Sequence, residues 1–207
     1  LSMNIPKAML IDLDDTILDD SSNVESAWER ACAAHREEFG PIDVDKVLSI
    51  IREARVWYFS DADRHRTGRL DLPAARRRIV DVALKKLGID RPALAEEIGD
   101  AYSAIRDAEI TALPGAIDTL MCLRSAGCRL ALVTNGAASA QRRKIEQFHL
   151  AEYFERIFIE GELGFGKPDP RVYAAAVSQL SVGPAEAWMV GDNLEWDVAA
   201  PQRQGIF

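Results

Sequence analysis

The chain has 207 residues, a length that suits one α/β domain with an insertion or two small domains, and 48% of them are hydrophobic, enough for a sizeable core. Its formal net charge of -8 argues against binding to nucleic-acid polymers, because contact with their phosphate backbone requires clustered positive charge. Cys32, Cys122 and Cys128 are too few and too scattered for a disulfide framework or a zinc site. We find no long apolar span and no signal peptide, so we expect a cytoplasmic protein without membrane contact.

The first predicted strand is the short apolar run at residues 8–11, which leads directly into Asp12, Asp14 and Asp15. A long helical segment follows. Ser22 and Glu25 fit a capping box that opens its first helix. We expect no strand in this segment, and a polar, irregular loop at residues 60–69. The expected helices cover residues 22–39, 43–59, 71–87 and 92–107.

After Pro114-Gly115 the pattern changes to alternating helices and strands. The expected helices cover residues 116–125, 137–148, 169–180 and 196–204, and the expected strands cover residues 129–133, 156–159 and 187–190. Such alternation predicts a parallel sheet with right-handed crossovers, in which ligands bind at the carboxyl ends of the strands. We therefore expect an α/β core made of residues 1–19 and 110–207, with an all-helical domain at residues 20–109 inserted after the first strand.

Asp12 and Asp14 form the first candidate site. Side chains alternate along an extended backbone, so these two carboxylates can project to the same side. Two carboxylates that close repel each other unless a cation lies between them, which suggests a magnesium site. One aspartate would then be free to attack a substrate and the other to move protons. The alternative is an acidic turn, which Asp and Thr also favour, and these residues alone leave both interpretations open.

Three further groups of polar residues lie at or after predicted strand ends. Thr134-Asn135-Gly136 supplies a hydroxyl and a turn whose N–H groups can face an anion. Lys167 lies in a loop with two prolines, which suits an ammonium that neutralises a phosphoryl group. Asp192 can bind magnesium, with Asn193 and Asp197 supporting it. Each group taken alone also fits an ordinary loop, and Asp197 fits the first turn of a helix.

Taken together and in this order, these residues resemble the four short motifs of the haloacid dehalogenase (HAD) superfamily of hydrolases. The matching stretches are Asp12-Leu13-Asp14-Asp15-Thr16, Thr134-Asn135-Gly136, Lys167-Pro168, and Gly191-Asp192 through Asp197. The resemblance spans nearly the whole chain. It implies a Rossmann-like parallel sheet core, with residues 20–109 as the superfamily's helical cap.

The resemblance also implies a two-step phosphoryl transfer. Asp12 would attack phosphorus and form an aspartyl-phosphate, and Asp14 would protonate the leaving alkoxide and then take a proton from water. Mg²⁺ is implied on Asp12, the backbone carbonyl of Asp14, and Asp192. The residues implied to hold the phosphoryl oxygens are Thr134, Asn135, Gly136 and Lys167.

Asp14 also separates branches of the superfamily. Haloacid dehalogenases need no acid two residues after the nucleophile, so its presence points to phosphate ester chemistry. We expect a phosphatase that acts on a small phosphorylated metabolite, as a monomer or homodimer. A phosphomutase, which hands the phosphoryl group to a sugar, is an alternative. A receiver-type signalling protein or a phosphate-binding protein without turnover is another, although receivers lack the long helical insertion.

The helical cap should decide the substrate. Trp57, Arg64, His65 and Arg66 lie at the polar stretch between two cap helices, where they suit a mobile edge that closes on an anionic group or a base ring. The alternative is a solvated charge cluster beside core aromatics, and the residues favour it. Arg76-Arg77-Arg78 is most simply a solvated helix face.

Overall fold

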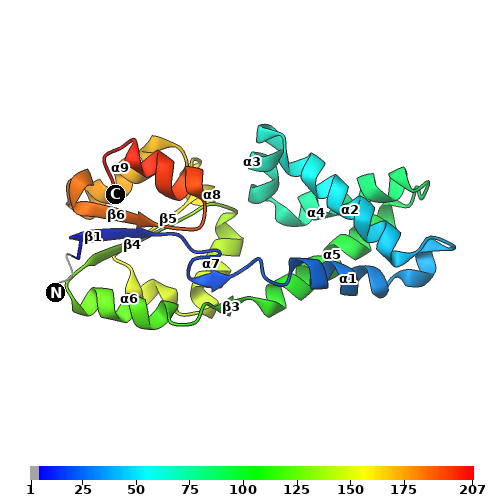
Figure 1. Ribbon diagram of the computed structural model, residues 1–207, viewed down its shortest axis with the longest axis horizontal. Coiled ribbons are helices and arrows are strands. Elements are labelled where there is room, and N and C mark those ends of the chain that lie inside the picture. Colours follow the sequence, from blue (N-terminus) through cyan, green and yellow to red (C-terminus); the bar gives the residue numbers. More distant parts are fainter. Residues whose placement is uncertain (1–4) are drawn as a thin grey trace. The chain divides into compact units, whose positions relative to one another are not determined.

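The computed structural model describes residues 5–207 and confirms the predicted α/β fold. The chain forms two compact units, which divide between Asp19 and Asp20 and again between Ile110 and Thr111. Unit 1 contains the stretches on either side of residues 20–110, and unit 2 is the segment 20–110 itself. Figure 1 draws unit 2 in blue, cyan and green.

A four-stranded parallel sheet in the order β5-β4-β1-β6 forms the centre of unit 1 (Figure 1). Its strands are β1 (Ala8–Ile11), β4 (Arg129–Thr134), β5 (Arg156–Ile159) and β6 (Ala187–Val190). β1 is buried along its whole length, which explains why it reads as a continuous apolar run. Ile11 pairs with Leu132 on one side and with Val190 on the other, so three strands end side by side.

Helices cover both faces of this sheet. They are α6 (Ala116–Ser125), α7 (Ala138–Gln147), the short α8 (Glu160–Leu163) and α9 (Pro170–Gln179). Ala8 and Leu10 of β1 share a hydrophobic cluster with Val172 and Tyr173 of α9. α6 packs against β4 and lies on the other side of the sheet from α9 in Figure 1. The sheet is therefore buried on both faces, as parallel sheets usually are.

The end of unit 1 differs from the predicted helix at residues 196–204. Asn193 accepts hydrogen bonds from the N–H groups of Glu195 and Trp196, and this cap starts a π-helical segment, Leu194–Ala199, two residues early. The short α10 (Ala200–Gln202) follows. The backbone of Phe207 then exchanges two hydrogen bonds with β6, 2.7 Å to the Met189 N–H and 3.1 Å to the Ala187 carbonyl.

A small antiparallel pair joins the two ends of unit 1 that border unit 2. β2 (Leu18–Asp19) pairs with β3 (Thr111–Ala112). Neither strand was predicted, because two residues are too short for a periodic pattern.

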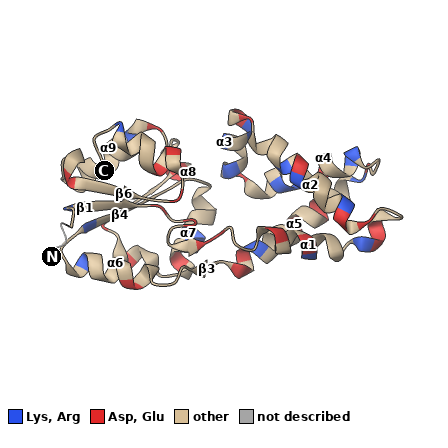
Figure 2. Ribbon diagram, viewed as in Figure 1, with Lys and Arg blue, Asp and Glu red and all other residues tan. Residues whose placement is uncertain are grey.

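Unit 2 is all-helical, as predicted. Its helices are α1 (Val24–Ala33), α2 (Val44–Phe59), α3 (Ala62–Leu70), α4 (Leu72–Lys86) and α5 (Pro92–Glu109), with a 3₁₀ turn at Arg36–Phe39. Ile51, Ile79, Leu84 and Ile98 are among the buried residues of a core that belongs to this unit alone. Figure 2 shows charged residues of both signs interspersed along these helices.

The predictions for the polar stretch of unit 2 and for the start of its first helix are wrong. The polar stretch 60–69 is not a loop but mostly helix α3, which Asp61 caps by accepting from the Arg64 N–H at 2.9 Å. The capping box of Ser22 and Glu25 is also wrong, because Asn23 is the N-cap and makes no side-chain cap bond. Its amide instead donates to Glu109 at 2.7 Å.

No helix within residues 5–207 combines the length and the apolar character needed to cross a membrane.

Candidate active site

The carboxyl end of the sheet gathers acids and a lysine. Lys167 Nζ lies 2.8 Å from Asp12 Oδ1 and 2.6 Å from Asp197 Oδ1. Carboxylate oxygens of Asp12, Asp192 and Asp197 all lie within 4.8 Å of one another. The structure thus brings together residues from the ends of β1 and β6 and from the loop before α9, as the positions of the motifs predict.

Asp12 is buried, and its environment sets its charge. Loss of solvent raises the pKa of Asp12 to about 7, the Lys167 ammonium opposes that rise, and the nearby Asp197 carboxylate adds to it. Lys167 is itself 1% exposed and is held between two carboxylates. A buried lysine needs such partners, because a desolvated ammonium without them is very unfavourable. Lys167 is therefore not the solvated loop residue that its sequence context alone would allow.

Asn135 fixes the position of Lys167 through the backbone. Its Nδ2 donates to the Lys167 carbonyl at 2.6 Å and its Oδ1 accepts from the Lys167 N–H at 2.8 Å. We call this pair of hydrogen bonds the Asn135 clamp. Gly166 is required beside it, since a Cβ at that position would lie 2.4 Å from Asn135 Oδ1. The side chain of Asn135 thus has a structural role that the sequence did not reveal.

Asp197 is fully engaged on both oxygens. Oδ1 accepts from Lys167 at 2.6 Å, and Oδ2 accepts from the Asn193 N–H at 3.0 Å. Gly191 lies against this carboxylate, and a Cβ at that position would come within 2.2 Å of Asp197 Cγ. These bonds suit a residue that orients Lys167 and the loop at Asn193, and the supporting role expected for Asp197 stays a prediction.

Asp14 lies in a different environment, built by two residues that the sequence reasoning missed. Lys144 Nζ donates to Asp14 Oδ1 at 2.7 Å, and Gln141 Nε2 donates to Asp14 Oδ2 at 2.9 Å. Both side chains are buried. Their spacing of three residues puts them on one face of α7, and two buried polar groups on one helix face were the available signal.

Gln141 also connects Asp14 to the second motif. Its Nε2 lies 2.6 Å from Thr134 Oγ1, a hydroxyl that is buried with its residue. The Gly136 N–H, by contrast, donates to the buried carboxylate of Glu160 at 3.1 Å. Gly136 therefore does not present its N–H to an anion, unlike what its motif suggested.

The donors at this end of the sheet suit a hard divalent cation. Asp12 and Asp192 contribute oxygen atoms only, which is the ligand type that Mg²⁺ prefers. Partial burial and the nearby carboxylates of Asp15 and Asp197 raise the pKa of Asp192, so negative charge is crowded here. Since both oxygens of Asp197 already accept hydrogen bonds, Asp12 and Asp192 are the better carboxylate ligands.

The candidate substrate residues of unit 2 are largely occupied within that unit. Arg64 donates to the carbonyls of Trp57 and Tyr58 at 2.7 and 3.2 Å, and its guanidinium lies 4.3 Å from the centre of the Trp57 ring. The His65 ring packs edge-on against Phe59 at 5.6 Å. Arg66 is exposed on α3.

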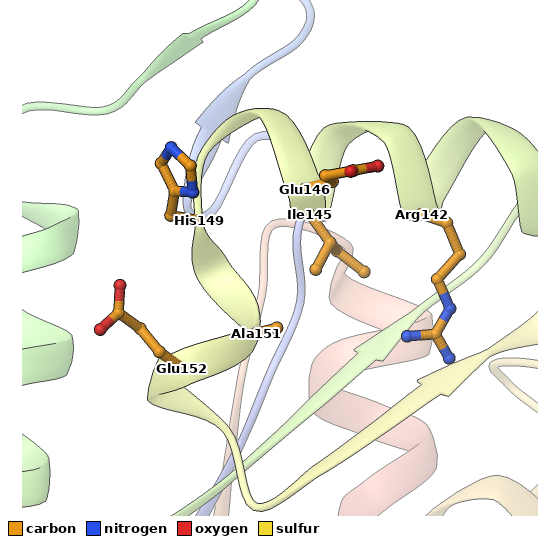
Figure 3. A pocket seen from close by; sticks show the side chains of 6 residues that line it. All are labelled: Arg142, Ile145, Glu146, His149, Ala151 and Glu152. Carbon is orange, nitrogen blue, oxygen red and sulfur yellow. The ribbon is translucent and has the colours of Figure 1, made fainter.

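A surface depression in unit 1 lies apart from these acids along the chain. Figure 3 shows its lining at the end of α7 and the turn that follows, with Arg142, Glu146, His149 and Glu152 around it. Arg142 pairs with Glu162, and none of the predicted site residues lines the depression. We assign it no chemistry.

The fold and the acids at its strand ends define a hydrolase of the α/β class with a helical insertion. The model of the haloacid dehalogenase-like hydrolases matches residues 6–205, and the chain belongs to this family.

Named relatives refine this assignment. The chain is 31% identical to the glyceraldehyde 3-phosphate phosphatase of Methanopyrus kandleri over 97% of its own length and 81% of the relative's. It is 33% identical to the phosphoserine phosphatase of Thermus thermophilus over 97% and 86% of the two chains. The crystal structure of a 2-haloacid dehalogenase from Pseudomonas syringae superposes with a TM-score of 0.62 at 27% identity, over 97% and 84% of the chains. The two phosphatases, which match nearly the whole chain, place it in the phosphatase-like branch of the family, and the dehalogenase structure shows the shared fold.

Proposed function

We propose that this protein is a magnesium-dependent phosphatase that hydrolyses a small phosphorylated metabolite through an aspartyl-phosphate on Asp12. The observation that carries the proposal is that two carboxylates at one strand end contact different side chains. Asp12 is buried against Lys167, whereas Asp14 is held by Lys144 and Gln141. Two acids in different environments suit two different roles in one reaction.

Asp12 is the proposed nucleophile. Its carboxylate oxygen attacks phosphorus as the bond from phosphorus to the ester oxygen breaks, and the phosphoryl group is transferred to Asp12. Lys167, at 2.8 Å, offsets the repulsion between this carboxylate and an anionic substrate. Water then attacks the phosphorus of the intermediate, which releases phosphate and restores the Asp12 carboxylate.

Asp14 is the proposed acid and base. It donates a proton to the departing alkoxide in the first step and takes one from the attacking water in the second. Lys144 and Gln141 each bond one of its two oxygens, so the carboxylate is held in one orientation. Positioning of this kind supplies much of the rate of phosphoryl transfer.

The phosphoryl oxygens have three proposed partners. Thr134 Oγ1 and the Asn135 N–H lie at the end of β4, and Lys167 is fixed in its loop by the Asn135 side chain. Gly136 is left out, because its N–H is already bonded to Glu160.

Mg²⁺ is the proposed cofactor, held by Asp12, Asp192 and the backbone carbonyl of Asp14. When bound, it would supply positive charge that offsets the repulsion between Asp12 and an anionic substrate. The oxygen-only donor set of these acids supports this proposal.

The proposed substrate is a phosphate monoester of low molecular weight. This rests on the names of two relatives that match nearly the whole chain, a glyceraldehyde 3-phosphate phosphatase and a phosphoserine phosphatase. We propose that the protein acts in the cytoplasm as a monomer or homodimer. Trp57, Arg64, His65 and Arg66 stay candidates for contact with substrate.

The test is Asp12→Asn, assayed with an aryl phosphate in the presence of magnesium. We expect loss of activity by at least about 10³-fold, because the amide cannot form the covalent intermediate, with the fold retained. Asp118→Asn, an exposed residue on α6, makes the same chemical change and should keep full activity. Full activity of Asp12→Asn would rule out this nucleophile.

A panel of phosphorylated metabolites, which includes glyceraldehyde 3-phosphate and phosphoserine, then identifies the substrate class. Release of inorganic phosphate supports a phosphatase. Isomerised sugar phosphate from a hexose 1-phosphate and its bisphosphate would instead show a mutase.

A further inference from the structure

Unit 2 contains a group of nitrogen donors around one tyrosine. The indole ring of Trp28 on α1 stacks on Tyr102 of α5, with ring centres 3.7 Å apart and planes inclined by 10°. The guanidinium carbon of Arg76 on α4 lies 5.0 Å from the centre of the Tyr102 ring, and that of Arg106 lies 6.0 Å from it. Three helices therefore direct an indole and two arginines to the same place.

The two arginines differ in their partners. Arg106 is 4% exposed and pairs with Asp20 at 3.0 Å, with a further long contact of 3.5 Å to Tyr102 Oη. Arg76 is half-buried, and within residues 5–207 its guanidinium makes no hydrogen bond or ion pair. The prediction that Arg76 belongs to a solvated helix face is therefore wrong. Its neighbour Arg77 does fit that prediction, since it is exposed and pairs with Asp100 at 2.7 Å.

Buried donors exceed acceptors in this cluster. Trp28 Nε1 and Arg106 Nε are both buried, and neither has a hydrogen-bond partner in the described chain. Most buried polar groups in folded proteins are hydrogen-bonded, because an unpaired one is unfavourable by a few kcal/mol. Loss of solvent also lowers the pKa of Arg76 and the charge of Arg106 lowers it further, while the carboxylates of Asp107 and Asp20 oppose the decrease. The cluster combines two guanidinium groups, whose charge these acids partly balance, with unused N–H groups.

We propose that Trp28, Arg76, Tyr102 and Arg106 form a binding site for an oxyanion, the carboxylate or phosphate group of a small organic molecule. Two planar guanidinium groups suit the paired oxygens of either group. The indole N–H and the tyrosine hydroxyl add neutral donors, and the stacked rings supply an apolar wall. The site lies wholly within unit 2 and does not depend on the proposed phosphatase activity.

The test is a titration of the full chain, followed through the Trp28 indole N–H signal in ¹H–¹⁵N spectra. Trp28→Phe identifies that signal, and the indole of Trp188 in unit 1 serves as an internal reference. Malonate and inorganic phosphate are the two probes, at constant ionic strength. We expect the Trp28 signal to shift and saturate with at least one probe. A response to malonate alone indicates a carboxylate ligand, and a response to phosphate alone a phosphoryl ligand.

Neighbouring arginines provide a matched control. Arg76→Met should weaken binding of the probe about tenfold or more, because it removes charged hydrogen bonds, whereas Arg77→Met removes the same charge one residue away and should leave it unchanged. Arg76→Lys keeps the charge but lacks the paired N–H groups of the guanidinium, so it should bind the probe with intermediate affinity. This variant replaces Arg76→Met in the test if Arg76→Met perturbs the fold. Unsaturated shifts with both probes, or equal affinity in the Arg76 and Arg77 variants, would overturn the proposal.

Discussion

Asp12 and Asp14 are two residues apart, yet they have different neighbours. Asp12 is buried, shares Lys167 with Asp197, and has a pKa raised to about 7. Asp14 accepts from Lys144 and Gln141, one donor for each oxygen. The difference arises because each residue meets side chains from a different part of the chain. The spacing in the sequence predicts that Asp12 and Asp14 lie close together, whereas the difference between their surroundings arises from tertiary contacts.

The raised pKa of Asp12 predicts how stability depends on pH. The folded metal-free protein keeps a proton on Asp12 up to about pH 7, whereas the unfolded chain loses it near 3.8. Between these values the folded state binds more protons, so this residue makes the protein less stable as pH rises. The free energy of unfolding of Asp12→Asn should therefore equal that of the wild type near pH 4 and exceed it by about 2 kcal/mol at pH 8. This value is half of the free energy that corresponds to the full shift in the pKa of Asp12.

Urea unfolding in chelator, followed through NMR signals of unit 1, measures this difference. Asp118→Asn on α6 is the control and should show no such trend. A difference between wild type and Asp12→Asn that stays flat from pH 4 to 8 would contradict the proposed environment of Asp12.

Lys144 is predicted to be a positioning residue for Asp14. Lys144→Met should lower kcat by about tenfold to a hundredfold with little change in KM, because the acid loses its orientation and the substrate keeps its phosphate contacts. Lys144→Arg should restore part of the loss. In an Asp14→Asn background, Lys144→Met should have no further effect. Arg142→Met removes an exposed cation from the same helix, one that pairs with Glu162 of α8, and should leave kcat unchanged. Additive losses in the double variant would refute the link to Asp14.

At the level of elements, the sheet and most helices were predictable from sequence. β5 and β6 have their predicted bounds, and β4 extends only one residue further, to Thr134. Buried parallel strands are short apolar runs, and each here ends in a turn or a polar residue, which makes their limits visible. Because the strands are parallel, residues after their carboxyl ends had to meet, and the candidate site followed from that rule.

Other elements left no local signal. Helix α3 is so polar that it has no periodic pattern of apolar residues. The capping residue Asp61 was the one remaining sequence signal for the start of this helix. The clamp of Asn135 on the Lys167 backbone joins residues 32 positions apart, so it depends on how β4 and the next loop lie in space. The contacts of Gln141 and Lys144 with Asp14 span more than a hundred residues for the same reason.

The Asn135 clamp gives a prediction about the loop before α9. Asn135→Ala removes both side-chain bonds to the Lys167 backbone and should destabilise unit 1 by about 1–3 kcal/mol. It should also lower kcat, because Lys167 is no longer held beside Asp12. Asn23→Ala removes a comparable amide, bonded to Glu109 in unit 2, and should leave kcat intact. Activity assays and amide hydrogen exchange at Lys167 distinguish the Asn135→Ala variant from the Asn23→Ala variant. Unchanged exchange at Lys167 in Asn135→Ala would refute the clamp.

At the scale of the whole molecule, each unit has a hydrophobic core of its own. The cluster that contains Leu10, Tyr173 and Met189 belongs to unit 1, and the one that contains Trp28, Ile51 and Leu84 belongs to unit 2. The chain as a whole carries a net charge of -8, and three of its acids converge within 4.8 Å at the end of the sheet. Negative charge concentrated in this way repels itself, so a bound cation should stabilise the folded chain.

Magnesium should accordingly raise the melting temperature of the chain, and more so at higher pH. Ligand at a hundred times its Kd adds about 2.7 kcal/mol, which corresponds to roughly 5 °C or more for a chain of this size. Because protons compete for Asp12 and Asp192, whose pKa values are both raised, the increase should be largest near pH 8 and small near pH 5. Asp192→Asn should abolish it, and Asp118→Asn should retain it. Thermal unfolding with magnesium, with sodium chloride of equal ionic strength and with chelator measures the effect, and an equal rise with sodium chloride would show screening instead of a site.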